Sequence, residues 1–179
     1  LLPLINETTI YSYVNVNRFL TRGLELNFNN NIYPWLTLKF GFTFTGQKID
    51  MTGANNIDFE YYTDYNASLN YWIKKFDLTF SVYFKHNGES PRLYLPEVGE
   101  EPILRKMASY QTLDINMSKW FWKKRINVQV GGKNLFDNTD IAISGSPAGG
   151  GGGHTSGGSS LPVNWGRTFF VKLQFRYSK

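Results

Sequence analysis

The chain has 179 residues, no cysteine and a formal net charge of +5. It has no apolar run of 18 or more residues, which excludes a transmembrane helix, and without cysteine it can form neither disulfides nor thiolate metal sites. The mean hydropathy of −0.34 is typical of a soluble protein, but it does not exclude a membrane β-barrel, whose strands are only half apolar.

The positive charge does not predict nucleic-acid binding. Lysine and arginine lie mostly at turns beside aromatic residues, as in Lys74-Lys75 and Lys123-Lys124-Arg125. The chain has neither a basic helix nor a nucleic-acid-binding motif.

Residues 1–16 predict a loop or a partial strand, because Ile10, Tyr11, Tyr13 and Val14 favour β structure without regular alternation. The first residues do not resemble a signal peptide. We therefore expect that a leader was removed, or that this chain is the tail of a longer one.

From residue 17 onward, apolar and polar residues alternate along seven segments. In the clearest of them, Leu36, Leu38, Phe40, Phe42 and Phe44 alternate with polar or small residues. Period-two alternation predicts a strand whose two faces meet different surroundings. The apolar positions that define the seven segments run over 24–28, 36–44, 65–71, 78–84, 113–117, 126–130 and 169–177.

Short and long connections follow one another in turn. Tight turns are predicted near 31–34, 73–76 and 121–124, and long loops over 46–59, 86–109 and 137–165. The glycine-rich stretch 145–160 within the last loop predicts an exposed surface segment. Bacterial outer-membrane barrels have short periplasmic turns and long extracellular loops, so this rhythm favours an antiparallel transmembrane β-barrel.

Aromatic residues gather at the three tight turns. Amphipathic rings favour the headgroup level of a membrane. We interpret the following residues as lipid-interface aromatics: Tyr33, Trp35, Tyr71, Trp72, Trp120 and Trp122.

Charged residues on the polar side of the strands are candidates for the barrel interior. We expect Glu25 to lie across from Lys39, where opposite charges contribute about 0.2–1 kcal/mol. The candidate lumen-facing residues are Glu25, Lys39, Asp77, Lys85, Asp114 and Lys133.

The sequence offers no catalytic constellation. Its two histidines, His86 and His154, lie in or beside predicted loops, and no metal-binding or nucleophile motif surrounds them. We therefore expect neither enzymatic activity nor a cofactor or metal.

Three short motifs follow one another in the order found in one known family. Arg22-Gly23-Leu24-Glu25 opens a strand, Asn134-Leu135-Phe136-Asp137 follows the penultimate strand, and Gly166-Arg167 precedes the last. In this order and spacing the chain resembles the C-terminal part of TonB-dependent outer-membrane receptors, in the style of those of Bacteroidota. The resemblance covers residues 17–177 and includes no plug domain and no TonB-contact segment.

The resemblance implies that residues 17–179 form the last seven or eight strands of a plugged barrel of about 22 strands. It implies active uptake of a scarce ligand across the outer membrane of a Gram-negative bacterium. The implied partners are outer-membrane lipid, the remaining barrel with its plug, and TonB with its inner-membrane energising complex, reached through the plug. A surface lipoprotein is a further candidate partner.

Two alternatives stay open at this point. A complete outer-membrane barrel of about eight strands would have an adhesive or structural role, and it requires residues 1–16 to supply a strand. A soluble lipocalin-like binding barrel would instead place Phe40, Phe42 and Phe44 inside.

Overall fold

The computed structural model describes residues 18–50, 58–94, 103–144, 160–162 and 165–177. The interpretation of residues 1–16 lies outside this part of the chain. So do the prediction for the glycine-rich segment, apart from residue 160, and His154.

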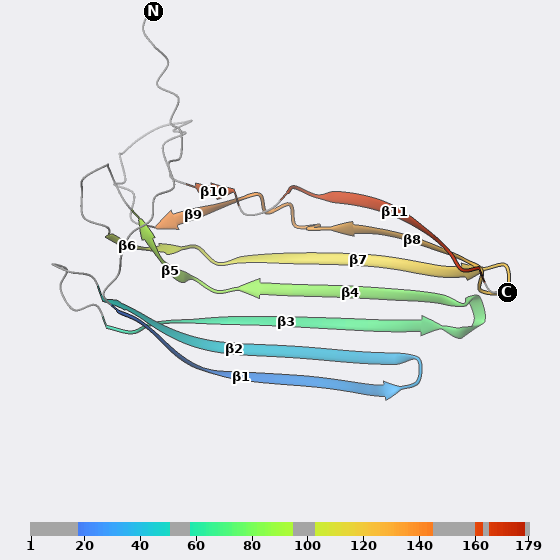
Figure 1. The fold of residues 1–179 in the computed structure, drawn as a ribbon, viewed down its shortest axis with the longest axis horizontal. Coiled ribbons are helices and arrows are strands. Elements are labelled where there is room, and N and C mark those ends of the chain that lie inside the picture. The colour runs from blue at the N-terminus through green and yellow to red at the C-terminus, as the bar shows by residue number, and fades with distance from the viewer. Residues whose placement is uncertain (1–17, 51–57, 95–102, 145–159, 163–164, 178–179) are drawn as a thin grey trace, which may run out of the picture.

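Seven strands form one antiparallel sheet in the order β1-β2-β3-β4-β7-β8-β11, with β1 and β11 at opposite edges (Figure 1). This confirms the predicted all-β antiparallel fold and the count of seven long strands. The sheet is open, because β1 and β11 do not pair with each other. The bounds are β1 (Arg18–Tyr33), β2 (Leu36–Asp50), β3 (Glu60–Ile73), β4 (Leu78–Asn87), β7 (Tyr110–Phe121), β8 (Ile126–Lys133) and β11 (Thr168–Phe175).

A second, four-stranded sheet lies at the end of the long connections, in the order β10-β9-β6-β5 (Figure 1). The predicted start of the first loop, 46–59, is wrong because β2 continues to Asp50. The second sheet corrects the other two predicted loops, which contain paired strands because the backbone extends the hairpins beyond the long sheet. The bounds are β5 (Ser90–Tyr94), β6 (Ile103–Met107), β9 (Asp140–Ser144) and β10 (Ser160–Pro162).

The tight turns are all at the opposite end of the sheet. β1 continues through Tyr33, so the first turn is Pro34–Trp35 and not 31–34. The second is the 3-10 turn η1 (Lys74–Phe76), which Asp77 ends in the left-handed conformation. The third runs from Trp122 through Arg125, and its first three residues have positive φ angles.

Large apolar side chains lie on the surface of the long sheet rather than in a core. Leu24, Leu26 and Phe28 are each more than half exposed, and Phe169 and Val171 are more than 70% exposed. Among the described residues the buried apolar side chains are Ile49, Met107 and Ile141, all at the long-connection end. A contiguous exposed apolar surface of this extent requires a covering partner.

Candidate functional site on the polar face of the sheet

Over much of the sheet the strand register pairs apolar residues with apolar ones. One apolar row joins Leu26, Phe42 and Tyr65 and ends at His86 on β4, and the next apolar row joins Phe28, Phe40, Ala67 and Phe84. Because side chains alternate between faces along a strand, the residues between these rows form a continuous polar face. This sorting separates an apolar outer surface from a polar inner one.

Small hydroxyl and amide side chains line much of the polar face. A row of five neighbours crosses from β1 to β7, with Asn31 opposite Thr37, then Asn70, Ser81 and Asn116. The Thr37 hydroxyl donates to Asn31 Oδ1 at 2.8 Å, and the Ser81 hydroxyl donates to Asn70 Oδ1 at 2.7 Å. The two contacts satisfy polar groups within the wall itself.

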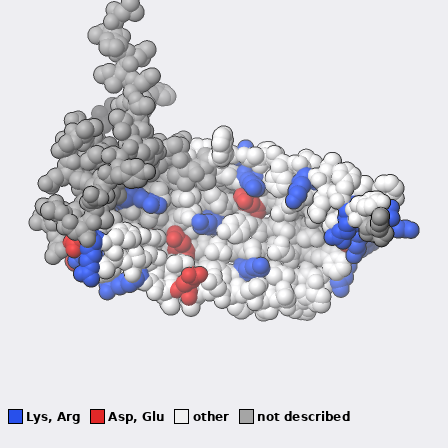
Figure 2. Space-filling view, in the orientation of Figure 1, with Lys and Arg blue, Asp and Glu red and all other residues white. Residues whose placement is uncertain are grey.

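The register places five of the six candidate lumen-facing charges on this face. On the apolar face, the positions from Leu24 to Phe28 on β1 and from Leu36 to Phe44 on β2 carry no charged residue. The charged atoms in the middle of Figure 2 therefore belong to the polar face. None of the five forms an ion pair with a residue that the structure describes. These five are Glu25, Lys39, Lys85, Asp114 and Lys133.

Two details of that prediction are corrected. Glu25 lies opposite Thr43, and Lys39 lies opposite Asn29. The hairpin is centred two residues later than expected, and moving the centre of a hairpin by two residues moves each partner by four. Asp77 lies in the turn before β4, where its Oδ1 accepts a hydrogen bond from the Trp72 indole N–H at 3.1 Å.

The family-like segment after β8 forms a hydrogen-bonded turn centred on Asn134. This asparagine is 6% exposed and has a φ of 49°, a left-handed conformation that asparagine tolerates better than most residues. Its side-chain N–H groups donate to the carbonyls of Asn138 at 3.0 Å and Trp165 at 3.1 Å. Its Oδ1 accepts from the Asn138 backbone N–H at 3.2 Å.

The same turn ties together three strands of the long sheet. The backbone N–H of Asn134 donates to Asp114 Oδ1 on β7 at 2.9 Å. Asp137 Oδ1 accepts from the Arg167 backbone N–H at 2.7 Å, and the Arg167 Nε donates to the Leu135 carbonyl at 3.1 Å. We call Asn134, Asp137, Asn138 and Arg167 the strand clamp, because they fix the start of β11 against β7 and β8.

Sequence reasoning found only part of the strand clamp. The family resemblance points to Asn134, Asp137 and Arg167, whereas no motif in the sequence indicates a role for Asn138. Its side chain donates to the Gln111 carbonyl at 2.6 Å. The available signal was asparagine at both ends of a five-residue turn, since asparagine readily bonds to nearby backbone.

Two consecutive glycines explain the one break in the alternation of the last strand. Phe170 lies on the polar face opposite Gly131, and Phe169 lies on the apolar face opposite Gly132. A Cβ on Gly131 would lie 2.8 Å from the Phe170 ring, and one on Gly132 would lie 2.7 Å from Leu135. Each glycine therefore accommodates a bulky neighbour on its own face.

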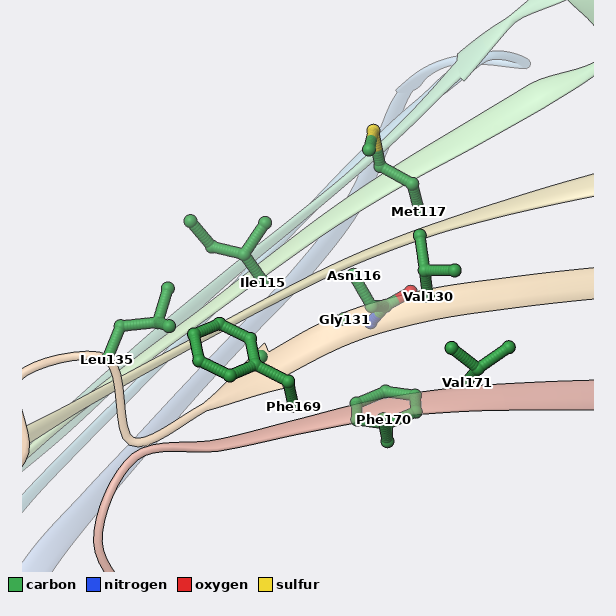
Figure 3. A pocket seen from close by; sticks show the side chains of 10 residues that line it. Ile115, Asn116, Met117, Val130, Gly131, Leu135, Phe169, Phe170 and Val171 are labelled. Atoms are coloured by element: carbon green, nitrogen blue, oxygen red, sulfur yellow. The ribbon is translucent and has the colours of Figure 1, made fainter.

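An open, mostly apolar hollow of about 520 Å³ lies beside Gly132 and is lined by residues of β7, β8 and β11. Figure 3 shows Leu135, Phe169 and Ile115 close to one another, with Met117, Val130 and Val171 farther along the strands. Most of the lining belongs to the apolar face, and Asn116, Gly131 and Phe170 of the polar face complete it.

Replacing Gly132 with valine is expected to weaken docking of β11 on β8. The added side chain meets Leu135 and the Phe169 ring, and overpacking of this kind costs about 1–3 kcal/mol. The urea dependence of the folded fraction of the full protein in lipid vesicles measures this loss. Val130→Ile, on the same face and strand, is the matched control and should change the midpoint little.

Aromatic residues do meet at the tight-turn end, but on both faces. Tyr33 stacks on Trp35 with ring centroids 4.8 Å apart, and Trp35 meets Tyr71 edge-on at 5.4 Å. Trp72 and Trp120 lie opposite Thr79 and Asn127, which puts them on the polar face.

The placement of Trp72 and Trp120 differs from the predicted lipid-interface position. Proximity to a turn does not fix the face of a strand, whereas register does. Trp122 is in the third turn and is 72% exposed.

An ion pair links the second sheet to the long one. Lys106 Nζ lies 2.8 Å from Glu60 Oε2, and the hydrogen bond and charge of Glu60 raise the pKa of Lys106 above its usual value. A raised lysine pKa means that the contact contributes fully below the unfolded pKa and is lost as pH rises through the folded pKa. The contact is therefore present at neutral pH, with the modest strength of an exposed pair.

The described residues hold no group of three or more histidine, aspartate or glutamate side chains placed to bind a metal. In the same part of the chain, no helix is long and apolar enough to cross a bilayer.

An open antiparallel sheet with an apolar outer face, a polar inner face and length-segregated connections defines the class of outer-membrane β-barrel proteins. A sequence model described as the outer membrane protein beta-barrel family matches residues 3–147. The chain belongs to this family. No curated protein and no solved structure matches it.

Family membership implies an outer-membrane location, as in a Gram-negative bacterium. It rejects the soluble lipocalin-like alternative, whose phenylalanine face would be enclosed. We therefore expect the apolar face, including Phe40 and Phe44, to meet lipid in that membrane.

Spin labels at two adjacent positions of β2 are expected to report opposite surroundings. A label at Phe42 should be strongly relaxed by oxygen dissolved in the bilayer, whereas a label at Thr43 should respond to a water-soluble relaxant, because the two side chains leave opposite faces. Power-saturation electron paramagnetic resonance measures both. The reverse accessibility, or equal accessibility at the two sites, would contradict the assignment of the faces.

Proposed function

We propose that this chain forms the C-terminal wall of a plugged outer-membrane transporter, which takes up a scarce ligand with energy delivered by TonB. The observation that carries the proposal is the set of five charged side chains on the inner face without ion-pair partners among the described residues. Such groups suit a wide interior that holds water and a second protein domain. In the proposal they contact the plug.

The open edges favour a barrel larger than these seven strands. An unpaired backbone group in hydrocarbon costs several kcal/mol, so β1 and β11 need neighbouring strands. The interior of an eight-stranded barrel is just wide enough to be filled by side chains. Glu25, Asn27 and Lys39 put long polar or charged side chains on the inner face, which suits a barrel of about 22 strands with a plugged lumen.

The sequence motifs supply the particular transporter class. Three segments, Arg22-Gly23-Leu24-Glu25, Asn134-Leu135-Phe136-Asp137 and Gly166-Arg167, resemble parts of TonB-dependent receptors. On that resemblance, the plug passes energy from TonB and the inner-membrane complex, and a surface lipoprotein can cover the long loops. This segment then forms wall and extracellular surface, not the gate.

The native polypeptide in isolated outer membranes tests the proposal. Peptides from this sequence should map to a polypeptide with a mass several times 20.6 kDa. Site-specific crosslinking in living cells should join that polypeptide to TonB, and energy-depleted cells should serve as the control.

Two outcomes would contradict the proposal in different ways. A native mass near 20.6 kDa with no TonB crosslink would support the small structural or adhesive barrel instead. A large polypeptide that never crosslinks to TonB would retain the large barrel and reject energised uptake.

A further inference from the structure

The outer face changes character at the long-connection end of β1 and β2. The last apolar row there pairs Leu24 with Phe44, and the next residues on the same face are Arg22 and Gly46. Farther along, Leu20 pairs with Lys48, and Arg18 pairs with Asp50. We call Arg18, Arg22 and Lys48 the outer basic patch.

The depth of this patch follows from strand geometry. Outward positions on β1 run from Tyr33, opposite Leu36, to Leu24, opposite Phe44, without a charged residue, and Leu20 lies beyond Arg22. Because barrel strands tilt by about 40°, crossing an apolar band about 25 Å tall takes roughly 33 Å of strand, or about ten residues. Counted from Tyr33, that length ends beside Gly23, so Arg22 is at the edge of the band on the side of the long connections, which is the extracellular side.

Arg22 is held in place by aromatic residues from β3 and the residue before it. Its guanidinium lies 3.8 Å from the centre of the Phe59 ring and donates a hydrogen bond to the Tyr61 hydroxyl. Gly46, directly between Arg22 and Tyr61 in the register, lets the Tyr61 ring approach, since a Cβ there would lie 2.5 Å from it. A guanidinium fixed in this way retains donors that can face outward.

Lys48 supplies a second cation beside the first. Lys48 is the diagonal neighbour of Arg22 across the β1–β2 pair. Diagonal neighbours are about 7–8 Å apart, so both long side chains can reach the same anion. Asp50 is the one carboxylate on these outward rows of the two strands, and Glu60 lies on the other face in its pair with Lys106. The rows therefore carry a net positive charge just above the apolar band.

We propose that the outer basic patch binds a phosphate of the outer-leaflet glycolipid, lipid A. Arg22 and Lys48 contact one phosphate group while the acyl chains lie along the apolar rows that begin at Leu24 and Phe44. Charge complementarity carries the choice of occupant, because phosphates of this lipid lie at the level that the register gives the patch. The inference concerns the outside of the wall, so it does not depend on transport through the interior.

The test uses the full native protein purified in mild detergent and returned to vesicles. The vesicles contain phosphatidylcholine with phosphorylated lipid A, dephosphorylated lipid A or phosphatidylglycerol, and native mass spectrometry counts lipid bound per protein. We expect selective retention of phosphorylated lipid A. The double substitution Arg22→Gln with Lys48→Gln should reduce that retention roughly thirty-fold, the equivalent of about 1 kcal/mol for each cation near the surface.

Single substitutions separate binding from packing. Arg22→Lys keeps the charge and should retain most lipid, whereas Arg22→Gln should not. Lys48→Gln leaves the Arg22 contacts untouched and should still weaken retention. Lys39→Gln removes a cation from the inner face and serves as the matched control without effect.

Three results would overturn the proposal. They are unchanged retention in the double variant, equal retention of dephosphorylated lipid A, and equal retention of phosphatidylglycerol. Equivalent losses in Arg22→Lys and Arg22→Gln, with none in Lys48→Gln, would assign Arg22 to packing alone and also reject the site.

Discussion

Replacing Phe40 with arginine is expected to lower the free energy of unfolding of the membrane-inserted barrel by about 2–4 kcal/mol, the depth-dependent cost of arginine near the bilayer midplane. Phe40 lies in the central apolar row with Phe28 and Ala67, and it is 45% exposed on the outer face. Because we expect lipid and not protein to cover this surface, the new charge should find no partner in the wall.

The measurement is reversible unfolding in lipid vesicles, followed by the change in electrophoretic mobility between folded and unfolded barrel. Thr43→Arg is the matched control, because Thr43 is on the same strand and opposes Glu25 and Asp64 on the inner face. That variant should retain stability within about 0.5 kcal/mol. A larger loss at Thr43 than at Phe40 would reverse the assignment of inside and outside.

Replacing Asn134 with alanine is expected to destabilise the barrel by about 2–4 kcal/mol. The substitution removes three hydrogen bonds of a side chain that is 6% exposed, two donated to the carbonyls of Asn138 and Trp165 and one accepted from the Asn138 backbone N–H, a loss of about 1–3 kcal/mol. It also places a residue with no local hydrogen bond at a φ of 49°, which adds about 1 kcal/mol. The loss of stability should be largest in β11, because the strand clamp holds its first residues.

Two companion variants divide the effect. Asn134→Gly relieves the backbone strain but still lacks the side chain, so it should lose about 1–3 kcal/mol. Asn29→Ala, at an exposed position of β1, is the control and should change stability little. Hydrogen exchange should show the loss of protection first at Phe169 and Val171, and uniform loss along all strands would contradict a local clamp.

The seven long strands were predictable because each one carries its own signal. Phe40, Phe42 and Phe44 must share a face in any strand that contains them, whatever lies next to it. The same period predicted two surroundings for the sheet. The four short strands near the long connections carried no such pattern, since three to five residues are too few to show alternation.

Partners across strands were less predictable than strands. Glu25 was expected to meet Lys39, and it lies opposite Thr43 because one proline-containing turn is centred later than its neighbouring asparagines indicate. The sequence motifs contain most of the strand-clamp residues but do not predict their contacts, since Arg167 and Asp137 are 30 residues apart in the chain. Loop-closing contacts of this length depend on the whole sheet.

The sequence by itself determined that this protein has seven half-apolar strands, joined by tight turns at one end and long connections at the other. Period-two alternation is a local property, so no tertiary information was needed. Only the tertiary structure decided which residues face each other, that Trp72 and Trp120 point to the polar face, and that Asn134 joins β7, β8 and β11. Register and clamp arise from hydrogen bonds between distant segments, and these exist only once the sheet has formed.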